Sequence, residues 1–321
     1  MQISNYKTID LKEKDIEMYL SSFNYVFEMN RTADEFKNMY LNTCLGYSFH
    51  TLYYDDAEKL CGGYTLVPFS YEVNGEKMIF AVGTDMFISE QYREDVGNII
   101  NVLNASIKNA KANGIVGCFG FPNDNSNNVS RAFLKEKRIG LLDTYILPYK
   151  VGDYKSSFKP LNIFSKLFSN CLLEVSKLSD DKKLVEYPIK KSRPEFYETR
   201  WNWFKHEDYH HYDEENLHAT WRITQFEGIK ACFLIDLYPM SKYNFDKSVR
   251  EMVKQERRNA GLFLYVGHLN FTPASMIKIP RKFEPKTFRF DFRILDKEKL
   301  SKEVVYTLDN WEVNLSSYDL L

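Results

Sequence analysis

The chain has 321 residues, of which 44% are hydrophobic and 27% charged, and its formal net charge is −1. Lys and Arg (43) nearly balance Asp and Glu (44), so no basic excess indicates nucleic acid as a main partner. No segment has the pattern of a signal peptide or a membrane span, and the five cysteines are odd in number and never spaced C-x-x-C. We therefore expect a cytoplasmic protein of two domains, each of about 150 residues, without a disulfide framework.

The first half of the chain alternates helical and strand-like patterns. Helices are expected over residues 13–29 and 32–42, and strands over 49–54, 61–73 and 77–89. Asn74-Gly75 is the hairpin turn between the last two strands. Apolar residues at helical spacing from Val96 to Ala110 predict a long helix, which Gly114 ends. A strand over 115–121, a short helix over 127–137 and a strand over 139–149 complete this half.

The second half repeats the order of the first. Residues 150–195 are interpreted as the connection and the first strands of a second unit, and strand, helix, strand and closing strand follow over 229–238, 244–260, 262–268 and 287–295. Two local matches support a duplication, because 84–87 (Thr-Asp-Met-Phe) parallels 235–238 (Ile-Asp-Leu-Tyr) and 120–123 parallels 267–270. The duplication divides the chain into domains 1–150 and 151–321.

This order of elements resembles the GNAT acyltransferase superfamily, in particular the tandem-GNAT proteins common in bacteria. The residues that carry the resemblance are 80–86 (Phe-Ala-Val-Gly-Thr-Asp-Met), the turn 91–93 (Gln-Tyr-Arg) and the strand end 120–123 (Gly-Phe-Pro-Asn). The resemblance implies an α/β (α+β) fold of two GNAT-like domains, each with a mixed, mostly antiparallel sheet flanked by helices. It also implies transfer of an acyl group from acetyl-CoA, or another acyl-CoA, to a primary amine of a small molecule, sugar or peptide.

The resemblance further implies where the acyl donor binds. The pantetheine arm lies along a central strand, and the diphosphate lies on the turn before the next helix, where backbone N–H groups and the helix dipole favour anions. The residues placed there are Met86, Phe87 and Ile88 on the strand, Arg93, Gly97 and Asn98 in the turn, and Asn123 at the end of the following strand.

Asp85 is the candidate catalytic residue. It lies in an apolar strand that faces the expected acyl site, and it occupies the same place in the first half as Asp236 in the second. A carboxylate there is suited to deprotonate an amine or to orient a water molecule. The alternative is a structural carboxylate that caps neighbouring backbone.

The phosphate turn departs from the family pattern. Val96 stands where the family has glycine, and Asn98 stands where it has glycine or alanine. Glu94 and Asp95 add carboxylates that repel phosphate. Residues 243–247 of the second half contain no glycine, and Phe133 or Leu134 stands near the place of the family's general-acid tyrosine. A GNAT-fold binding or assembly protein without catalytic activity is therefore the alternative function, with the second half the more degenerate.

Residues 206–210 spell H-E-x-x-H, a zinc-hydrolase signature when it lies on a helix. The segment is crowded with charge, so we interpret it as a solvated entry to the second domain, expect no metal site, and keep zinc hydrolysis as a third alternative. Trp201, Trp203 and Trp221 suit either acceptor stacking or core packing, and Cys118 is expected to be a buried, inert thiol. Transfer from aminoacyl-tRNA, which occurs among tandem-GNAT relatives, conflicts with the balanced charge. The acceptor and the oligomeric state stay open.

Overall fold

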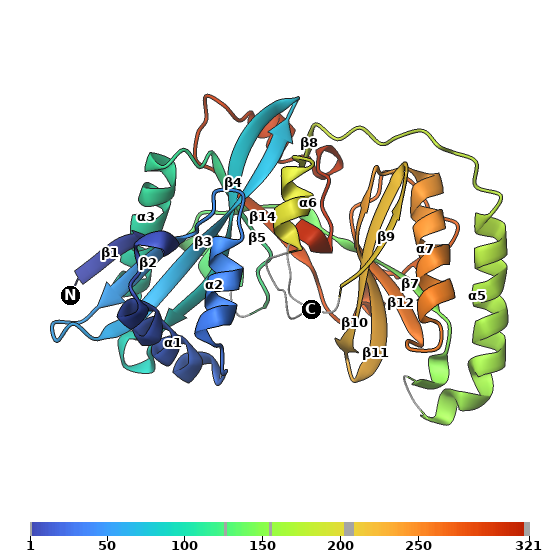
Figure 1. Ribbon diagram of the computed structural model, residues 1–321, viewed down its shortest axis with the longest axis horizontal. Coiled ribbons are helices and arrows are strands. Elements are labelled where there is room, and N and C mark those ends of the chain that lie inside the picture. The colour runs from blue at the N-terminus through green and yellow to red at the C-terminus, as the bar shows by residue number, and fades with distance from the viewer. Residues whose placement is uncertain (1, 125–126, 154–155, 202–208, 318–321) are drawn as a thin grey trace. The chain divides into compact units, whose positions relative to one another are not determined.

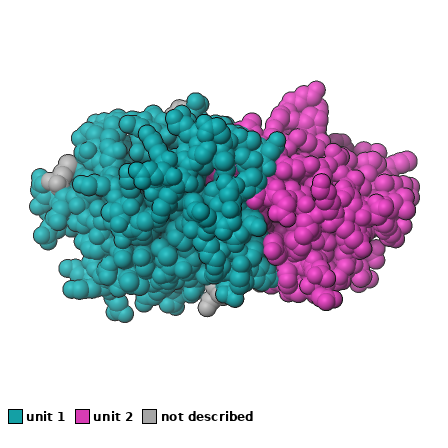
Figure 2. All heavy atoms as spheres, turned by 90° about the horizontal axis from the view of Figure 1, so that it is seen from above, with its two compact units in different colours: residues 1–140, 188–206, 289–310 teal, residues 141–187, 207–288, 311–321 magenta. Residues whose placement is uncertain are grey.

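The computed structural model describes residues 2–124, 127–153, 156–201 and 209–317, and these fall into two compact units. Unit 1 comprises residues 1–140, 188–206 and 289–310, and unit 2 comprises residues 141–187, 207–288 and 311–321 (Figure 2). Each unit is therefore discontinuous in the sequence. No helix in the described part of the chain is both long and apolar enough to cross a membrane.

Unit 1 contains an eight-stranded sheet of order β1-β2-β3-β4-β5-β14-β6, with β8 paired to β3 (Figure 1). β4 and β5 run parallel, whereas β1–β2, β2–β3, β3–β4, β3–β8 and β5–β14 are antiparallel. The strands are β1 (Gln2–Lys7), β2 (Phe49–Tyr54), β3 (Leu60–Val73), β4 (Glu76–Ile88), β5 (Gly117–Gly120), β6 (Lys137–Leu141), β8 (Ile189–Lys191) and β14 (Arg289–Ile294).

Helices pack on both faces of this sheet. On one face, α1 (Glu13–Phe27) and α2 (Ala33–Leu41) bring Tyr19 and Phe36 against His50 of β2. On the other, α3 (Val96–Ala112) buries Val102, Leu103 and other apolar residues in a core shared with β2–β5. The shorter helices of unit 1 are α4 (Asn127–Ala132), α6 (Glu195–Arg200) and α8 (Lys302–Val305). The sheet thus has two separately packed faces, as a covered central sheet requires.

Unit 2 contains a six-stranded sheet of order β13-β7-β12-β11-β10-β9. Its strands are β7 (Asp143–Pro148), β9 (Tyr209–Glu214), β10 (Leu217–Phe226), β11 (Ile229–Tyr238), β12 (Leu262–Gly267) and β13 (Ile277–Lys278). β11 and β12 run parallel and the other pairs are antiparallel. The core forms between this sheet and α7 (Lys242–Glu256), and α5 (Asn162–Ser176) packs beside α7 (Figure 1). The two mixed, mostly antiparallel sheets flanked by helices confirm the predicted fold class.

Each sheet includes a strand from a distant part of the sequence. β7 lies between β12 and β13 in unit 2, although it follows β6 of unit 1 directly, and β14 lies between β5 and β6 in unit 1. The interpretation of residues 139–149 as one strand is therefore wrong. The chain leaves one sheet at Leu141 and enters the other at Asp143, and the intervening Leu142 donates its N–H to the carbonyl of Phe288 at 2.9 Å. The predicted domains, residues 1–150 and 151–321, describe a duplication of the sequence and stay a prediction.

The local predictions differ in outcome along the chain. The helices α1, α2, α3 and α7 and the strands β2–β5, β11 and β12 lie where the periodicity placed them. The interpretation of residues 150–195 as connection and strands missed α5, and β1 was also missed. α5 was missed because it buries serines and exposes its large apolar residues, the reverse of the usual helix pattern.

Candidate functional site

The parallel strands β4 and β5 separate part of the way along. They pair only where residues 80–82 meet residues 117–119, and beyond Val82 the described part of β4 pairs with β3 alone. We call the region between residues 83–88 of β4 and the end of β5 at Gly120 the unit 1 fork. The edge of β4 that faces it has no strand partner in the described part of the chain, so its backbone N–H and C=O groups can bond to a ligand.

A β-bulge lies at the unit 1 fork. Gly63 pairs with Phe87 and Thr65 with Thr84, so Asp85 and Met86 together oppose the single residue Tyr64. Asp85 has a φ of 49°, which is uncommon for a residue other than glycine. Bulges of this kind redirect side chains and often lie near functional sites. Here the bulge turns the Asp85 carboxylate toward α1 and α2.

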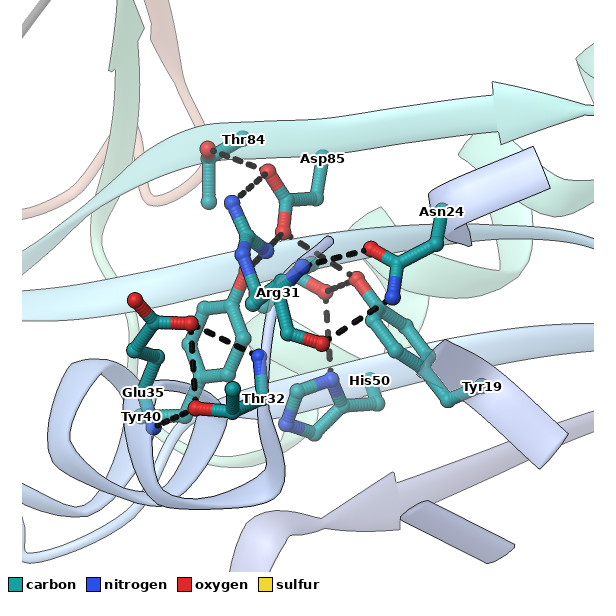
Figure 3. Close-up of polar contacts among 10 residues, drawn as sticks. Tyr19, Asn24, Arg31, Thr32, Glu35, Tyr40, His50, Thr84 and Asp85 are labelled. Atoms are coloured by element: carbon teal, nitrogen blue, oxygen red, sulfur yellow. Dashed lines mark hydrogen bonds and ion pairs between the residues drawn. The ribbon is translucent and has the colours of Figure 1, made fainter. Parts of the chain in front are cut away.

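The Asp85 carboxylate accepts contacts from four side chains (Figure 3). Oδ2 forms an ion pair with Arg31 Nη1 and accepts from the hydroxyls of Tyr40 and, at 3.3 Å, Tyr19. Oδ1 accepts two longer contacts, from Thr84 Oγ1 at 3.3 Å and from Arg31 Nη2 at 3.5 Å. Burial, followed by the Asp85 charge, raises the pKa of both tyrosines, so their hydroxyls remain donors at neutral pH. Oδ1 is thus the oxygen with more capacity for a further donor.

His50 extends this network into the core of unit 1. Its ring nitrogens lie 2.9 Å from Thr8 Oγ1 and 3.1 Å from Thr65 Oγ1, and complete burial lowers its pKa to about 3. His50 is therefore neutral at physiological pH. It supports the strands behind Asp85 and does not act there as an acid.

The opposite face of the unit 1 fork carries a second polar group of side chains. The Tyr64 hydroxyl lies directly on Gly83, where a Cβ would overlap it, and a Glu136 carboxylate oxygen is 3.4 Å from the position of a Cβ on Gly120. Burial, then Glu136 and Cys118, raise the pKa of Tyr64, which stays protonated. Sequence reasoning missed Tyr64 and Glu136. The available signal was Gly83, a glycine inside an apolar parallel strand, where a close approach is common.

The predicted strand residues of the donor site lie at the unit 1 fork. Met86 is the second residue of the bulge, and Phe87 and Ile88 continue β4 beyond it. Phe87 is buried, with its ring edge-on to Tyr19 at 5.4 Å. Arg93 Nε donates to the carbonyl of Ile88 at 2.7 Å. Asn123 is exposed just beyond β5.

The N-terminus of α3 already holds a carboxylate. Asp95 is its N-cap residue, and Asp95 Oδ1 accepts from the backbone N–H of Gly97 at 2.8 Å. The N–H of Asn98, whose side chain is buried, donates to the Asp95 carbonyl at 3.0 Å. This is the position where an anion would bind a helix N-terminus, so a diphosphate would have to displace Asp95.

Unit 2 has a matching fork with a different content. β11 and β12 pair over residues 231–234 and 262–265 and then separate, and a register shift lies beside Asp236. Asp236 is buried and accepts from Asn314 Nδ2 at 3.1 Å and Ser316 Oγ at 3.0 Å, and Gly267 forms a β-bridge with Asn314. Residues 311–317 therefore occupy the unit 2 fork.

The zinc-like motif lies largely outside the described residues, which include neither His206, Glu207 nor Asp208. Tyr209 and His210 belong to strand β9, and His210 Nδ1 is 3.2 Å from a Glu256 carboxylate oxygen. Within the part of the chain that the structure describes, no three His, Cys, Asp or Glu side chains are grouped to hold a metal ion. Trp203 also lies outside the described residues, and Trp221 is buried in the core of unit 2.

Comparison with known proteins identifies the fold. No protein-family model and no curated protein matches the sequence. Among solved structures, the chain is similar to a probable N-acyltransferase of unknown function from Enterococcus faecalis and to a GCN5-related N-acetyltransferase from Anabaena variabilis. Each is 13% identical, with a TM-score of 0.58 over 92% of this chain and 73% of the other.

A third similar structure is the N-myristoyltransferase of Saccharomyces cerevisiae with bound myristoyl-CoA. It is 10% identical, with a TM-score of 0.50 over 90% of this chain and 82% of that one. At such identities the likeness concerns the fold. The chain therefore has the tandem GNAT fold, as the likeness to these solved structures shows.

Proposed function

We propose that the protein is an N-acyltransferase and that unit 1 transfers an acyl group from an acyl-CoA to a primary amine. The observation that carries the proposal is the unit 1 fork, an unpaired strand edge with a different polar group on each face. Acyl-CoA would supply an activated thioester. The amine would form the new C–N bond while the C–S bond breaks, and a proton would pass from the amine to the leaving sulfur.

The face toward α3 suits the acyl donor. The edge of β4 beyond Val82 has no strand partner in the described part of the chain, so its backbone at Met86 and Phe87 can hydrogen-bond the amides of an extended arm, while the Ile88 carbonyl already accepts from Arg93. The protonated Tyr64 hydroxyl at Gly83 is the group proposed to donate a hydrogen bond to the leaving sulfur. Arg93 and the turn at Gly97 are the positions proposed for the diphosphate.

The face toward α1 and α2 suits the acceptor. Asp85 Oδ1, with its two longer contacts, is the acceptor proposed for a hydrogen bond from the amine. Arg31 holds the same carboxylate through Oδ2 and fixes its direction. Asp85 would thus orient the amine toward the fork, and correct orientation of two reactants is a large part of such catalysis.

A second candidate is a GNAT-fold binding or assembly protein without transfer activity. One contact favours it, that between the Asp95 carboxylate and the Gly97 N–H, because it fills the expected anion position with a negative charge. The two candidates differ in whether acyl-CoA binds at all.

Calorimetric titration with acetyl-CoA tests the proposal. We expect binding to the wild-type protein that Gly97→Asp weakens at least about tenfold, because a second acid enters the α3 N-terminus. Tyr243→Asp is the matched control, since Tyr243 holds the same position in α7, after its N-cap Ser241. This control should bind like wild type.

Turnover is then measured as thiol release with a panel of amines. Asp85→Asn should lower kcat/KM about 100-fold, while Asp236→Asn, the equivalent change in unit 2, leaves it within a few-fold once both variants are shown to fold. A true site adds about 2–3 kcal/mol of stability at saturating acetyl-CoA. If the protein shows no binding heat and no thermal stabilisation, the transferase proposal is overturned and the binding protein remains.

A further inference from the structure

The helix α5 is fastened to unit 2 through small polar residues. Ser165 and Ser169 are buried, and their hydroxyls donate to the carbonyls of Tyr149 at 3.2 Å and Pro148 at 3.1 Å. Leu172 and Leu173 are only partly buried against the core. Figure 1 shows α5 as the outermost helix beside α7 of this unit. Most of its large apolar side chains are thus left on its other face.

That outer face carries a regular heptad stripe. Six positions alternate in steps of three and four residues, the spacing of the a and d positions of a coiled coil. Five of them are between 45% and 80% exposed, and the sixth, a cysteine, is exposed as well. The stripe consists of Leu161, Phe164, Phe168, Cys171, Val175 and Leu178. Ile163 and Leu167, which are 69% and 58% exposed, widen this face beyond the a and d positions. An exposed apolar helix face of this width is suited to packing against a second helix.

The stripe is complementary to itself when a second copy lies antiparallel. The six positions are symmetric about the midpoint between Phe168 and Cys171. In an antiparallel pair, a positions face d positions, so Phe168 meets the small Cys171 of the second copy and Phe164 meets Val175. Leu161 and Leu178 then pair at each end. Large side chains facing small ones fill such an interface evenly, and a two-fold contact requires this self-complementarity.

The charges beside the stripe agree with the same arrangement. By sequence position, Lys159 mirrors Asp180 about the same midpoint, and both are exposed and lie just beyond the two ends of α5. The stripe itself contains no charged residue, and antiparallel helices also oppose their dipoles favourably. The helical part of the seam is the 15 residues of α5, about 22 Å long, with Leu161 before it and Leu178 after it. This is a short contact, so dissociation in the micromolar range is expected.

We propose that α5 is the interface of a two-fold dimer, in which the α5 helices of two copies pack antiparallel through this stripe. The occupant is a second copy of this chain. The dimer is independent of acyl-CoA binding and of the unit 1 fork.

Sedimentation velocity over a concentration series tests the dimer. We expect reversible dimerisation, and Phe168→Glu should weaken it about 100-fold or more, because each copy would place a carboxylate in an apolar seam. Since Phe168 is exposed in the single chain, the variant should keep the wild-type melting temperature when both are compared as monomers. The matched control is Lys166→Glu, which alters charge on α5 outside the stripe and should leave the dissociation constant within a few-fold.

Cross-linking tests the orientation. In the Phe168→Cys variant, an added oxidant such as diamide takes two electrons and two protons from the new thiol and Cys171 of the second copy, and a disulfide dimer forms. Adding Cys171→Ser to this variant, or placing the cysteine at Lys166 instead, should abolish it. Equal cross-linking of wild type through Cys171 alone would indicate a parallel pair and overturn the antiparallel arrangement.

A monomer at about 100 µM would overturn the dimer itself. Co-sedimentation of that monomer with phosphatidylcholine–phosphatidylglycerol vesicles, lost in Phe168→Glu, would assign the stripe to a lipid surface instead.

Discussion

The two forks of this molecule have the same framework and different contents. In each, two parallel strands separate after a few paired residues beside a register shift, and an aspartate lies at the shift. In unit 1, Asp85 is ion-paired to Arg31, and the described strand edge toward β5 is unpaired. In unit 2, Asp236 is bonded by neutral side chains of residues 311–317, which also bridge to Gly267.

The forks therefore differ in what lies between their strands. In unit 2 it is residues 311–317, whereas in the described part of unit 1 the edge of β4 beyond Val82 has no strand partner. Residues 311–317 of unit 2 bond the Asp236 side chain and bridge to Gly267 of β12, so they lie where an extended ligand would enter the fork. The same place in unit 1 is lined by side chains that approach it from both faces, Asp85 from one and Tyr64 from the other. If one unit retains acyl-transfer chemistry, the contents of the two forks favour unit 1.

The largest expected difference concerns the partners of the two aspartates. Arg31→Ala should cost about 3–5 kcal/mol of unfolding free energy, because the mostly buried Asp85 carboxylate loses its counter-charge. Asn314→Ala should cost only about 1–3 kcal/mol, since Asp236 loses one neutral donor and keeps Ser316. Urea unfolding of both variants measures the two costs.

The double variant Arg31→Ala/Asp85→Asn is the control for this comparison. It should recover part of the stability lost in Arg31→Ala, because no unpaired charge remains. Equal costs for Arg31→Ala and Asn314→Ala would mean that the ion pair does not distinguish the two forks.

The next largest effect is a dependence of stability on pH. His50 has a folded-state pKa of about 3 against about 6.5 when unfolded. Between these values the unfolded chain binds a proton that the folded chain does not, so stability falls as pH drops from about 6.5 toward 3. At pH 5 this loss amounts to about 2 kcal/mol. His50→Gln should remove it, as measured by urea unfolding at pH 7 and pH 5.

His211 of unit 2 provides the comparison. Its pKa is also lowered by burial, but its side chain is only partly buried and bonds Thr220 Oγ1 at 3.0 Å. His211→Gln should therefore flatten the pH dependence less than His50→Gln does. If His211→Gln flattens the pH dependence of the unfolding free energy more than His50→Gln does, the core behind Asp85 is not the main acid-sensitive part of the fold.

Local sequence patterns predicted most elements but not how distant segments combine. The apolar stripe from Val96 to Ala110 and the hairpin at Asn74-Gly75 sufficed for α3, β3 and β4, because their periodicity is contained in one segment. The positions of β7 in the sheet of unit 2 and of β14 in the sheet of unit 1 were not predictable in this way. Strand pairing between residues more than about 110 positions apart, as in β7–β12 and β5–β14, has no local periodic signal.

For the candidate site too, the sequence suggested residues within one strand but not those that come from other segments. Asp85 and the strand residues 86–88 stay predicted site residues, and they lie on β4 at the unit 1 fork. Tyr64 and Glu136 were not predicted, because they approach β4 and β5 from β3 and from the segment before β6, and only the folded chain brings them there. α5 was missed for the opposite reason, since its apolar residues point away from its own unit.

The smallest expected effect on stability is the most informative about function. Asp95→Ala removes the N-cap of α3 and Ser241→Ala removes that of α7, where Ser241 Oγ accepts from the Asn244 N–H at 3.0 Å. Each should cost about 1 kcal/mol. Only Asp95→Ala also frees the Gly97 N–H and removes a negative charge from the proposed diphosphate position. It should therefore bind acetyl-CoA about five- to tenfold more tightly than wild type.

Ser241→Ala should leave that affinity unchanged, so the pair separates a local effect on the α3 N-terminus from a general loss of stability. Equal affinity of Asp95→Ala and wild type, with binding still detectable, would place the diphosphate away from α3. Tighter binding in Asp95→Ala alone would instead show that the carboxylate competes with the ligand. The contact between Asp95 and Gly97 would then set how readily unit 1 takes up its acyl donor.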